Sequence, residues 1–589
     1  MERVRVVAGG LLAGVAVFLV VAAPAAAMKG GKEPTLRAEK YPGTTTFECR
    51  TGAIPIHPGQ NLNDFGGTKT CPNAVKVSGP GSVADFAPGS TKKGYITRFK
   101  PSMVEIKPNG KLVTPSVWDL HLHHVVWIGP GLGPTFAAGE EKTIAKLPKG
   151  YGLKVAGDAD WTINQMIHNL TASDNRQVYI TWKIDWVPEA AGNAAGIEPI
   201  RIRWMDVAGW PQVYPVFDAK KNFDLNDDGR YVFPDEVPTD PSLPGYSQRE
   251  RISNVREWKV PAGGATLVFG AGHLHPGGKN VNLEVSRDGP DPGTVDGDSP
   301  GETKRLFRSR TKYYEPAGAV SWDVSMRATS RDWRVKLKEG DTARINVIYN
   351  VKKASWYESM GILPLAWSSA DDPLARDPWD DAAEVKAMYK DRGTLTHGRL
   401  KENIDAKARK NLKLPDPRKL KSRKRGLPDS GIDIRSFVYD RGGYSANRGF
   451  PKRLMRPPVV KRGERVEFTN LDALITMPNE EQAWHSITSC KAPCNRGSGI
   501  GYPLADGPLN FDSGQLGFGR GTSKEVTTGS NTWKTPKLKR PGKTYTYFCR
   551  IHPFMRGSIR VKGKRKGGKK RAEKAAEAAI SSGAFDTVG

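Results

Sequence analysis

Alternating apolar and polar residues predict β-strands along most of the chain. The clearest case is VYITWKIDWV, in which every second residue is large and apolar: Val178, Ile180, Trp182, Ile184 and Trp186. Side chains on a strand point to alternate faces, so this period indicates a sheet with one buried face. IRIRWMDV, VNLEVSR and ARINVIYNV repeat the pattern between turn residues, which predicts an all-β fold of β-sandwiches. One clear helix is expected, at DDAAEVKAMYKD (residues 380–391).

The length of 589 residues corresponds to about three or four domains at roughly 150 residues each. The opening MERVRVVAGGLLAGVAVFLVVAAPAAAM has a short basic start, an apolar run and small residues before Met28, which predicts a cleaved secretory signal. We therefore expect a secreted or cell-envelope protein, with retention of the apolar run as a membrane anchor as the alternative. The expected organisation is a signal peptide (1–27), two β-sandwiches (40–205 and 206–395), a basic linker (396–430), a third sandwich (431–562) and a basic tail (563–589).

The net charge of +28 is concentrated in two segments, residues 401–426 and 562–574. Neither has the apolar content of a core, so each is interpreted as a solvated linker or tail. In an exported protein the expected partner of such charge is an anionic cell-envelope surface, and no nucleic acid is expected.

The five cysteines leave one unpaired if Cys49 joins Cys71 and Cys490 joins Cys494. The remaining Cys549 lies in YFCRIHPFM, with His552 and Met555 at steps of three residues, and AWHSITS supplies His485 upstream. Thiolate, imidazole and thioether are the soft or borderline donors that favour copper over magnesium or calcium.

This segment resembles a cupredoxin of the amicyanin, pseudoazurin and plastocyanin type, over roughly residues 432–562. The resemblance implies a type 1 copper that moves single electrons, with four ligands: His485, Cys549, His552 and Met555. The stretch from His485 to Cys549 is longer than in small cupredoxins. Multicopper oxidases place histidines on both sides of the cysteine, whereas Phe548 and Arg550 stand there in this chain.

Six further histidines lie in three segments of the first two predicted sandwiches: His121, His123 and His124 in WDLHLHHVVWIGP, His168 in INQMIHNLT, and His273 and His275 in FGAGHLHPGGKN. Residues at i and i+2 share a face of a strand, so His273 and His275 form a chelating pair. Adjacent His123 and His124 face opposite sides, so they share one metal only if the strand bends or lies at an edge.

Their order resembles the copper type II, ascorbate-dependent monooxygenases, the family of peptidylglycine alpha-hydroxylating monooxygenase, over roughly residues 95–370. The resemblance implies two jelly-roll-like β-sandwich subdomains, each with one copper, across a solvent-filled cleft. The electron-transfer copper would bind His123, His124 and His168. His121 would either replace one of these ligands or contact one of them without binding the copper. The oxygen-binding, catalytic copper would bind His273, His275 and Met360. The complete fold expectation is these two subdomains followed by a Greek-key cupredoxin β-sandwich.

Two departures argue against peptide amidation. Ala271 occupies the position of a basic residue that holds the substrate carboxylate in the peptide-amidating enzymes, and residues 361–364 lack the polar groups used there.

The run DLNDDGRYVFPD fits a calcium loop with Asp224, Asn226, Asp228 and Asp235 as ligands. It fits an acidic turn without metal equally well.

The leading hypothesis is a copper monooxygenase that hydroxylates a C–H bond of an unknown small molecule or peptide, using an external electron donor and the type 1 domain. The alternative is a copper protein of the cell envelope that carries electrons or sequesters copper without catalysis. A third interpretation, in which the sandwiches bind glycan or peptide and their histidines are structural, predicts a single copper per chain.

Overall fold

The computed structural model describes most of the chain between residues 41 and 563. The described ranges are 41–58, 60–117, 119–169, 175–209, 215–287, 302–314, 323–352, 355–380, 393–403, 416–423, 426–429, 431–444, 455–474, 484–490, 510–518, 528–549, 552 and 555–563. The predicted all-β class is confirmed, since strands dominate these residues and one short α-helix and a few 3-10 turns accompany them.

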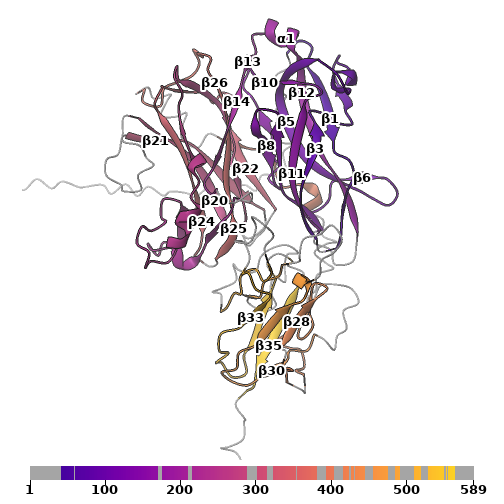
Figure 1. The fold of residues 1–589 in the computed structure, drawn as a ribbon, viewed down its shortest axis with the longest axis vertical. Helices are drawn as coiled ribbons and strands as arrows, with labels where there is room; N and C mark the ends of the chain where they lie inside the picture. Colours follow the sequence, from indigo (N-terminus) through magenta and orange to yellow (C-terminus); the bar gives the residue numbers. More distant parts are fainter. Residues whose placement is uncertain are drawn as a thin grey trace, which may run out of the picture. The chain divides into compact units, whose positions relative to one another are not determined.

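The first sandwich consists of a nine-stranded and a four-stranded sheet. In the larger sheet the central path runs in the order β13 (Glu198–Pro199), β10 (Tyr151–Ala156), β5 (Lys93–Ile106), β12 (Arg176–Pro188), β1 (Thr45–Arg50) and β4 (Val75–Ser78). Beside this path, β2 (Ile54–Ile56) pairs with β12, and β6 (Leu112–Val113) and β9 (Ala145–Lys146) pair with β5. The smaller sheet has the order β3 (Asn61–Lys69), β11 (Asp160–Asn169), β7 (Leu120–Gly129) and β8 (Gly133–Ala138). The helix α1 (Glu189–Ala194) and the 3-10 turn η1 (Val83–Phe86) complete this sandwich, and Figure 1 shows β5 and β12 side by side.

The second sandwich contains strands β14 to β27 in three sheets. A five-stranded sheet has the order β14 (Arg201–Asp206), β26 (Gly361–Ser368), β18 (Ala265–Gly270) and β23 (Val335–Leu337), with β19 (His273–Leu274) paired to β26. A seven-stranded sheet has the order β16 (Arg230–Phe233), β24 (Thr342–Asn350), β20 (Gly278–Arg287), β21 (Glu302–Tyr313), β22 (Val324–Thr329) and β27 (Gly393–Leu395), with β17 (Glu257–Lys259) on β24. β15 (Phe217–Ala219) pairs with β25 (Trp356–Ser359), and the 3-10 turns are η2 (Lys221–Phe223), η3 (Tyr246–Arg251) and η4 (Asn254–Arg256). The predicted domain boundary at residue 205 falls inside β14. This strand pairs along its whole length with β26 of the second sandwich.

The third sandwich has two four-stranded sheets. One has the order β29 (Val438–Tyr439), β28 (Ile432–Arg435), β31 (Glu467–Asn470) and β33 (Thr532–Lys534), and the other β30 (Val459–Val460), β35 (Arg556–Val561), β34 (Thr544–Phe548) and β32 (Thr488–Cys490). One pair in each sheet is parallel, β28 with β31 and β30 with β35. Of the two remaining 3-10 turns, η5 (Lys401–Asn403) precedes β28 and η6 (Asp472–Leu474) directly follows β31.

The five large apolar residues of β12 are all buried, as predicted, but Thr181, Asp185 and Val187 on its other face are buried as well, so β12 does not have the single buried face that was expected. The apolar cluster around β12 also includes Phe269, Ala271 and Ala366 of the second sandwich. Burial of apolar surface therefore holds the first two sandwiches together, and the interface between them is part of a common core.

Segments of the predicted basic linker pack against the sandwiches. Asn403 is buried, and its side chain accepts a hydrogen bond from the backbone N–H of Val117 at 3.1 Å and donates one to Asp323 at 3.0 Å. The guanidinium of Arg560 donates to the carbonyl oxygens of Pro417 and Leu420. The described parts of this segment are therefore docked on the folded protein, in contrast to the expected solvated linker.

Several predictions lie outside the described residues: the signal peptide, the helix after Asp380, residues 404–415 of the linker, and the tail from residue 564. No helix within the described ranges is long and apolar enough to cross a membrane. The predicted Cys49–Cys71 disulfide is present. Cys490 is also disulfide-bonded, and its predicted partner Cys494 lies outside the described residues.

Replacement of Trp182 by alanine is expected to destabilise the first sandwich by about 3–5 kcal/mol, because it leaves a cavity in the shared core. Trp182 is 1% exposed, and its indole N–H also loses a hydrogen bond to the Thr70 carbonyl. Urea unfolding monitored by circular dichroism measures the change. The matched control is Lys183→Ala, on the next residue of the same strand, where a half-exposed side chain is removed. A Trp182→Ala midpoint equal to that of the control would contradict the shared core.

Candidate copper centres

The predicted type 1 ligands converge in the third sandwich. Nδ1 of His485 lies 3.8 Å from Sγ of Cys549, Nδ1 of His552 lies 3.7 Å from the same sulfur, and the two nitrogens are 3.2 Å apart. All three residues are buried, and among the described residues they are the one group of three or more His, Cys, Asp or Glu side chains close enough to hold a metal ion. Cys549 forms no disulfide. One thiolate and two imidazoles at this spacing fit copper.

The loop after β34 folds these ligands toward one another. The backbone N–H of Cys549 donates to the carbonyl of Met555, and the N–H of Met555 donates to the carbonyl of His552. The sulfur of Cys549 accepts the backbone N–H groups of Ser486 and His552. Met555 is buried in the same apolar cluster as Cys549. The predicted axial methionine therefore belongs to the same buried cluster as the thiolate, and its backbone is hydrogen-bonded to that of Cys549.

Asp472 fixes the orientation of His485. Its Oδ2 accepts the Nε2–H of His485 at 2.9 Å and the backbone N–H of Phe437, while Oδ1 accepts the N–H of Ser436. Ser436 and Phe437 both have positive φ, which turns their N–H groups toward the carboxylate. With Nε2 occupied, Nδ1 of His485 is the nitrogen that faces Cys549. Asp472 was not predicted from the sequence.

The electrostatics favour a thiolate. Burial raises the pKa of Cys549, but hydrogen bonds with His485 and His552 outweigh it, and the pKa lies well below that of an ordinary thiol. Burial lowers the pKa of His485, but hydrogen bonds with Asp472 and Cys549 raise it to about 9. Because copper binds thiolate and not thiol, the ligand is already in its binding form.

A β-bulge explains how His123 and His124 approach each other. In the pairing of β7 with β11, Met166 is opposite His124 and Ile167 is opposite Leu122, so His123 is the extra residue of the bulged strand. The Nδ1 atoms of His123 and His124 are 3.3 Å apart, and Nε2 of His124 donates to the Asn164 side chain. The bend that a shared metal requires is therefore present.

The other histidines extend this pair across the interface between the first two sandwiches. Ring centroids are 4.9 Å apart for His123 and His168, and 4.3 Å apart for His123 and His275. His275 is 5.3 Å from His273, and His121 is 4.3 Å from His168. We call these six buried residues the histidine cluster: His121, His123, His124, His168, His273 and His275. The contact between His123 and His275 differs from the expected separation across a solvent-filled cleft.

Glu141 orients His273 from the opposite sandwich. Its Oε1 accepts Nδ1–H of His273 at 3.0 Å and the backbone N–H of Gly139 at 2.7 Å. Nε2 of His273 is buried and has no hydrogen-bond partner among the described residues, which leaves it as a lone-pair donor. A Cβ on Gly139 would lie 2.8 Å from Cε1 of His273, so glycine is required for this approach. The sequence signal for Glu141 was weak: two adjacent acids in an otherwise small and apolar stretch, FAAGEEKT.

Tyr349 positions the backbone of both His275 and Met360. Its hydroxyl accepts the N–H of His275 at 3.3 Å and the N–H of Met360 at 3.1 Å, and donates to the Met360 carbonyl at 2.8 Å. The Nδ1–H of His275 donates to the carbonyl of Glu358, so Nε2 is its lone-pair nitrogen. The Met360 side chain packs against Val216 and Ile362. Met360 is thus brought beside His275 through the backbone.

Burial lowers the pKa of five histidines of the cluster and keeps them neutral: His121, His123, His124, His168 and His275. It lowers the pKa of His121 and of His124 to about 3, and the pKa of His275 also lies well below its usual value, for the same reason and because of the nearby His273. Neutral imidazoles offer the lone pair that a metal needs.

The candidate calcium loop forms a compact acidic turn. Asp224 accepts the backbone N–H of Gly229 at 2.7 Å, and Asn226 donates to Glu236 at 3.1 Å. Asp228 accepts the N–H of Arg230, and Asp235 accepts the side-chain amide of Asn346 at 2.7 Å. The structure therefore places Glu236, and not Asp235, against Asn226.

Comparisons with solved structures give distant likenesses. A mutant amicyanin in its Cu(I) form is 16% identical, with a TM-score of 0.13, and the match covers 26% of this chain and 99% of the amicyanin. The copper-containing nitrite reductase of Thermus scotoductus SA-01 is 13% identical, with a TM-score of 0.14, and the match covers 52% of this chain and 59% of the reductase. The subviral-particle protein VP2 of infectious bursal disease virus is 10% identical, with a TM-score of 0.16, and the match covers 56% of this chain and 73% of VP2.

No family model and no curated protein matches the chain. At these TM-scores, the evidence for a copper site comes from the residues of this chain and the distances between them.

Replacement of Asp472 by asparagine is expected to weaken copper binding at His485, Cys549 and His552 by about 10–100-fold. The amide offers one oxygen, whereas three N–H groups converge on the carboxylate. Competition with a copper chelator, followed by thiolate-to-copper absorption, measures the affinity. Glu467→Gln, which removes a carboxylate from the ion pair with Lys534, is the control. Equal affinities of the two variants would exclude the orienting role of Asp472.

Proposed function

We propose that this protein is an exported copper oxidoreductase, in which a type 1 centre passes electrons to a copper monooxygenase site at the histidine cluster. The convergence of histidines from two sandwiches on one buried interface is the observation that carries the proposal, above all the 4.3 Å between the rings of His123 and His275. Purely structural histidines require no such convergence of neutral imidazoles.

The residues of the third sandwich fit copper as they stand, whereas the ligand atoms of the histidine cluster would have to move closer together to hold a metal. His485, Cys549, His552 and Met555 offer two imidazoles, a thiolate and a thioether, the donor set of a type 1 centre. In the cluster, His123, His124 and His168 are one set, and His273, His275 and Met360 are the other. Hydrogen bonds from Nδ1 of His273 and of His275 leave Nε2 of each as the ligand atom. Copper bound there would supply one-electron transfer and dioxygen chemistry.

The reaction class follows from the separate roles of the type 1 centre and the histidine cluster. Hydroxylation of a substrate R–H consumes one dioxygen, two electrons and two protons, and yields R–OH and one water. The electrons come from an external donor and enter through the type 1 centre. The protein supplies buried, oriented imidazoles and excludes bulk water, since the exposed fraction of each cluster histidine is 7% or less.

Contacts between the third sandwich and the other two support electron transfer within the chain. Burial lowers the pKa of His168 well below its usual value, and the nearby imidazoles of His121 and His552 lower it further. His552 is therefore electrostatically close to the histidine cluster. Phe548, which precedes Cys549, belongs to the buried apolar cluster of the second sandwich, and the Glu358 side chain hydrogen-bonds with Gln515. These contacts favour a path from Cys549 through His552 to His168.

Replacement of Cys549 by serine is expected to abolish the intense visible absorption of the copper-loaded protein, because that band requires a thiolate ligand. The same variant is expected to retain copper in the histidine cluster, as measured by metal analysis after gel filtration. Ser486→Ala, a change next to His485 that removes no ligand, is the control and keeps the band. Persistence of the band in Cys549→Ser would overturn the type 1 assignment.

Replacement of His273 by alanine is expected to lower substrate-dependent dioxygen consumption by a factor of at least about 10² and to leave the thiolate-to-copper band unchanged. An oxygen electrode and the visible spectrum measure the two effects on one sample. His57→Ala, at an exposed histidine bonded to Asn175, is the matched control. Unchanged dioxygen consumption in His273→Ala would favour the alternative of a non-catalytic copper carrier.

A further inference from the structure

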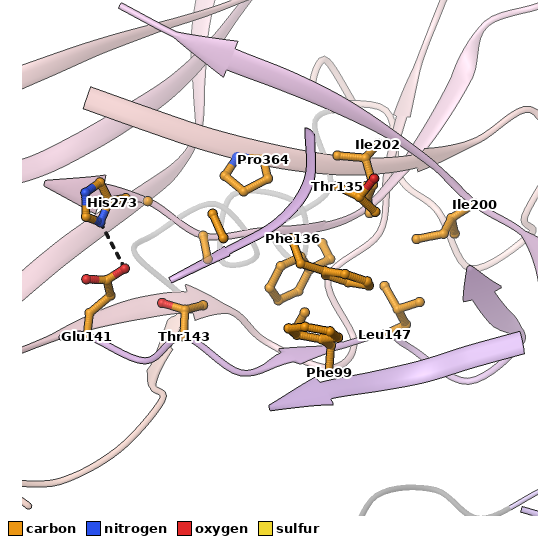
Figure 2. Close-up of a pocket in the computed structure, with 16 residues that line it drawn as sticks. Phe99, Thr135, Phe136, Glu141, Thr143, Leu147, Ile200, Ile202, His273 and Pro364 are labelled. Carbon is orange, nitrogen blue, oxygen red and sulfur yellow. Dashed lines mark hydrogen bonds and ion pairs between the residues drawn. The ribbon is translucent and has the colours of Figure 1, made fainter. Parts of the chain in front are cut away.

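A small cavity between the first two sandwiches ends at His273. Its volume is about 30 Å³. One water molecule needs roughly 10–15 Å³, so the cavity has room for a diatomic molecule. Figure 2 shows His273 and Glu141 at one end of it, and Ile200, Ile202 and Leu147 at the other. The cavity therefore extends from aliphatic side chains of both sandwiches to a predicted ligand of the oxygen-binding copper.

The aromatic wall limits the size of an occupant. The ring of Phe136 is stacked on Phe99, with centroids 4.0 Å apart, and on Trp161, with centroids 6.3 Å apart. Phe99 also packs edge-on against Trp127 at 4.8 Å. Because close-packed side chains move only at a cost in free energy, this wall does not open for a larger ligand. The occupant is therefore no larger than the cavity itself.

The lining away from His273 favours an apolar gas over water. A buried water makes about three hydrogen bonds to the protein, and apolar cavities stay dry and take up xenon. Thr135 already donates its hydroxyl to the Gly133 carbonyl at 2.8 Å. Oγ1 of Thr143, beside Glu141 in Figure 2, is a single polar atom and does not hold a water alone. The remaining side chains at the aliphatic end carry no polar atom: Phe99, Phe136, Ala145, Leu147, Ile200 and Ile202.

The exposure of the lining residues indicates where a molecule enters. Ala145, Leu147 and Ile202 are partly exposed, whereas His273 is 4% exposed and Glu141 is 2% exposed. The cavity is partly open to solvent, so its opening lies on the aliphatic side. A molecule that enters there contacts apolar side chains before it reaches His273.

We propose that this cavity is the site through which dioxygen reaches the histidine cluster. Dioxygen is an apolar diatomic molecule, so it fits both the volume and the lining, and it binds there without any change of bonds or charge. Binding of an apolar gas follows from the cavity alone. The consumption of dioxygen at His273 and His275 rests on the proposed function.

The first test measures xenon binding to the metal-free full chain by xenon nuclear magnetic resonance. Xenon is an unreactive, apolar atom, and we expect the unmodified protein to bind it. Ile202→Phe places a larger side chain in the cavity and is expected to lose this binding. Ala145→Leu fills the cavity from the other sandwich and gives an independent result if Ile202→Phe does not fold. The matched control is Ile54→Phe, since Ile54 is also partly buried against the same apolar cluster but does not line the cavity.

The second test measures how fast dioxygen reoxidises the reduced, copper-loaded full chain. Stopped-flow spectroscopy follows the return of the thiolate-to-copper band. Ile202→Phe is expected to slow the dioxygen-dependent rate by about tenfold, which corresponds to about 1.4 kcal/mol in the barrier, and Ile54→Phe is expected to leave it unchanged. Added xenon is expected to slow the unmodified protein and to have no effect on Ile202→Phe, because both gases occupy the same cavity. Circular dichroism verifies the fold of every variant.

Three results would overturn the proposal: no xenon binding to the unmodified protein, xenon binding that survives both Ile202→Phe and Ala145→Leu, or loss of xenon binding in Ile202→Phe with an unchanged rate of reoxidation. The proposed function fails separately. If xenon binds and is excluded by the two variants as described, but dioxygen does not reoxidise the reduced protein, the cavity is a site for an apolar gas and the monooxygenase assignment is wrong.

Discussion

The buried hydrogen bond between Glu141 and His273 connects the first two sandwiches at the point where their chemistry meets. Around it, Phe269, Ala271 and Ala366 of the second sandwich join the core of the first. A buried carboxylate is stable only with partners, and Glu141 finds them in an imidazole and a backbone N–H. The histidine cluster depends on this interface, because His123 and His275 come from different sandwiches. If the sandwiches separated, Glu141 would lose its contact with His273, and the histidines of the two sandwiches would no longer be close to one another.

The third sandwich achieves the same preorganisation by a different arrangement. Three N–H groups converge on Asp472, and the sulfur of Cys549 accepts two backbone N–H groups. The positions of His485 and Cys549 are therefore set by the protein before any metal binds, which lowers the reorganisation that accompanies electron transfer. In both sites a carboxylate outside the ligand set orients an imidazole. This shared hydrogen bond from an imidazole to a carboxylate supports copper chemistry at the cluster as well as at Cys549.

The sequence predicted the elements of the fold from local patterns, as in β12, where five apolar residues at a period of two are all buried. The type 1 ligands were equally readable, because Cys549, His552 and Met555 lie within one loop. The contact between His123 and His275 could not be predicted, since it depends on how two sandwiches pack. Glu141 was missed for the same reason, because it meets His273 across the two sandwiches. Tyr349 and Asp472 lie in the same sandwich as His275 and His485, but no local pattern of the sequence indicates that they meet these histidines. The bulge at His123 was anticipated as a requirement, and its position comes from the pairing with β11.

The central claim is that the chain holds copper at two kinds of centre, one with a thiolate ligand and one made of histidines from two sandwiches. Metal analysis combined with electron paramagnetic resonance on the copper-loaded full chain tests this most directly. The account predicts about three coppers per chain, with a narrow parallel hyperfine splitting for one of them and wider splittings for the others. A single copper per chain with only the narrow splitting would contradict it, and would assign the six clustered histidines a structural role.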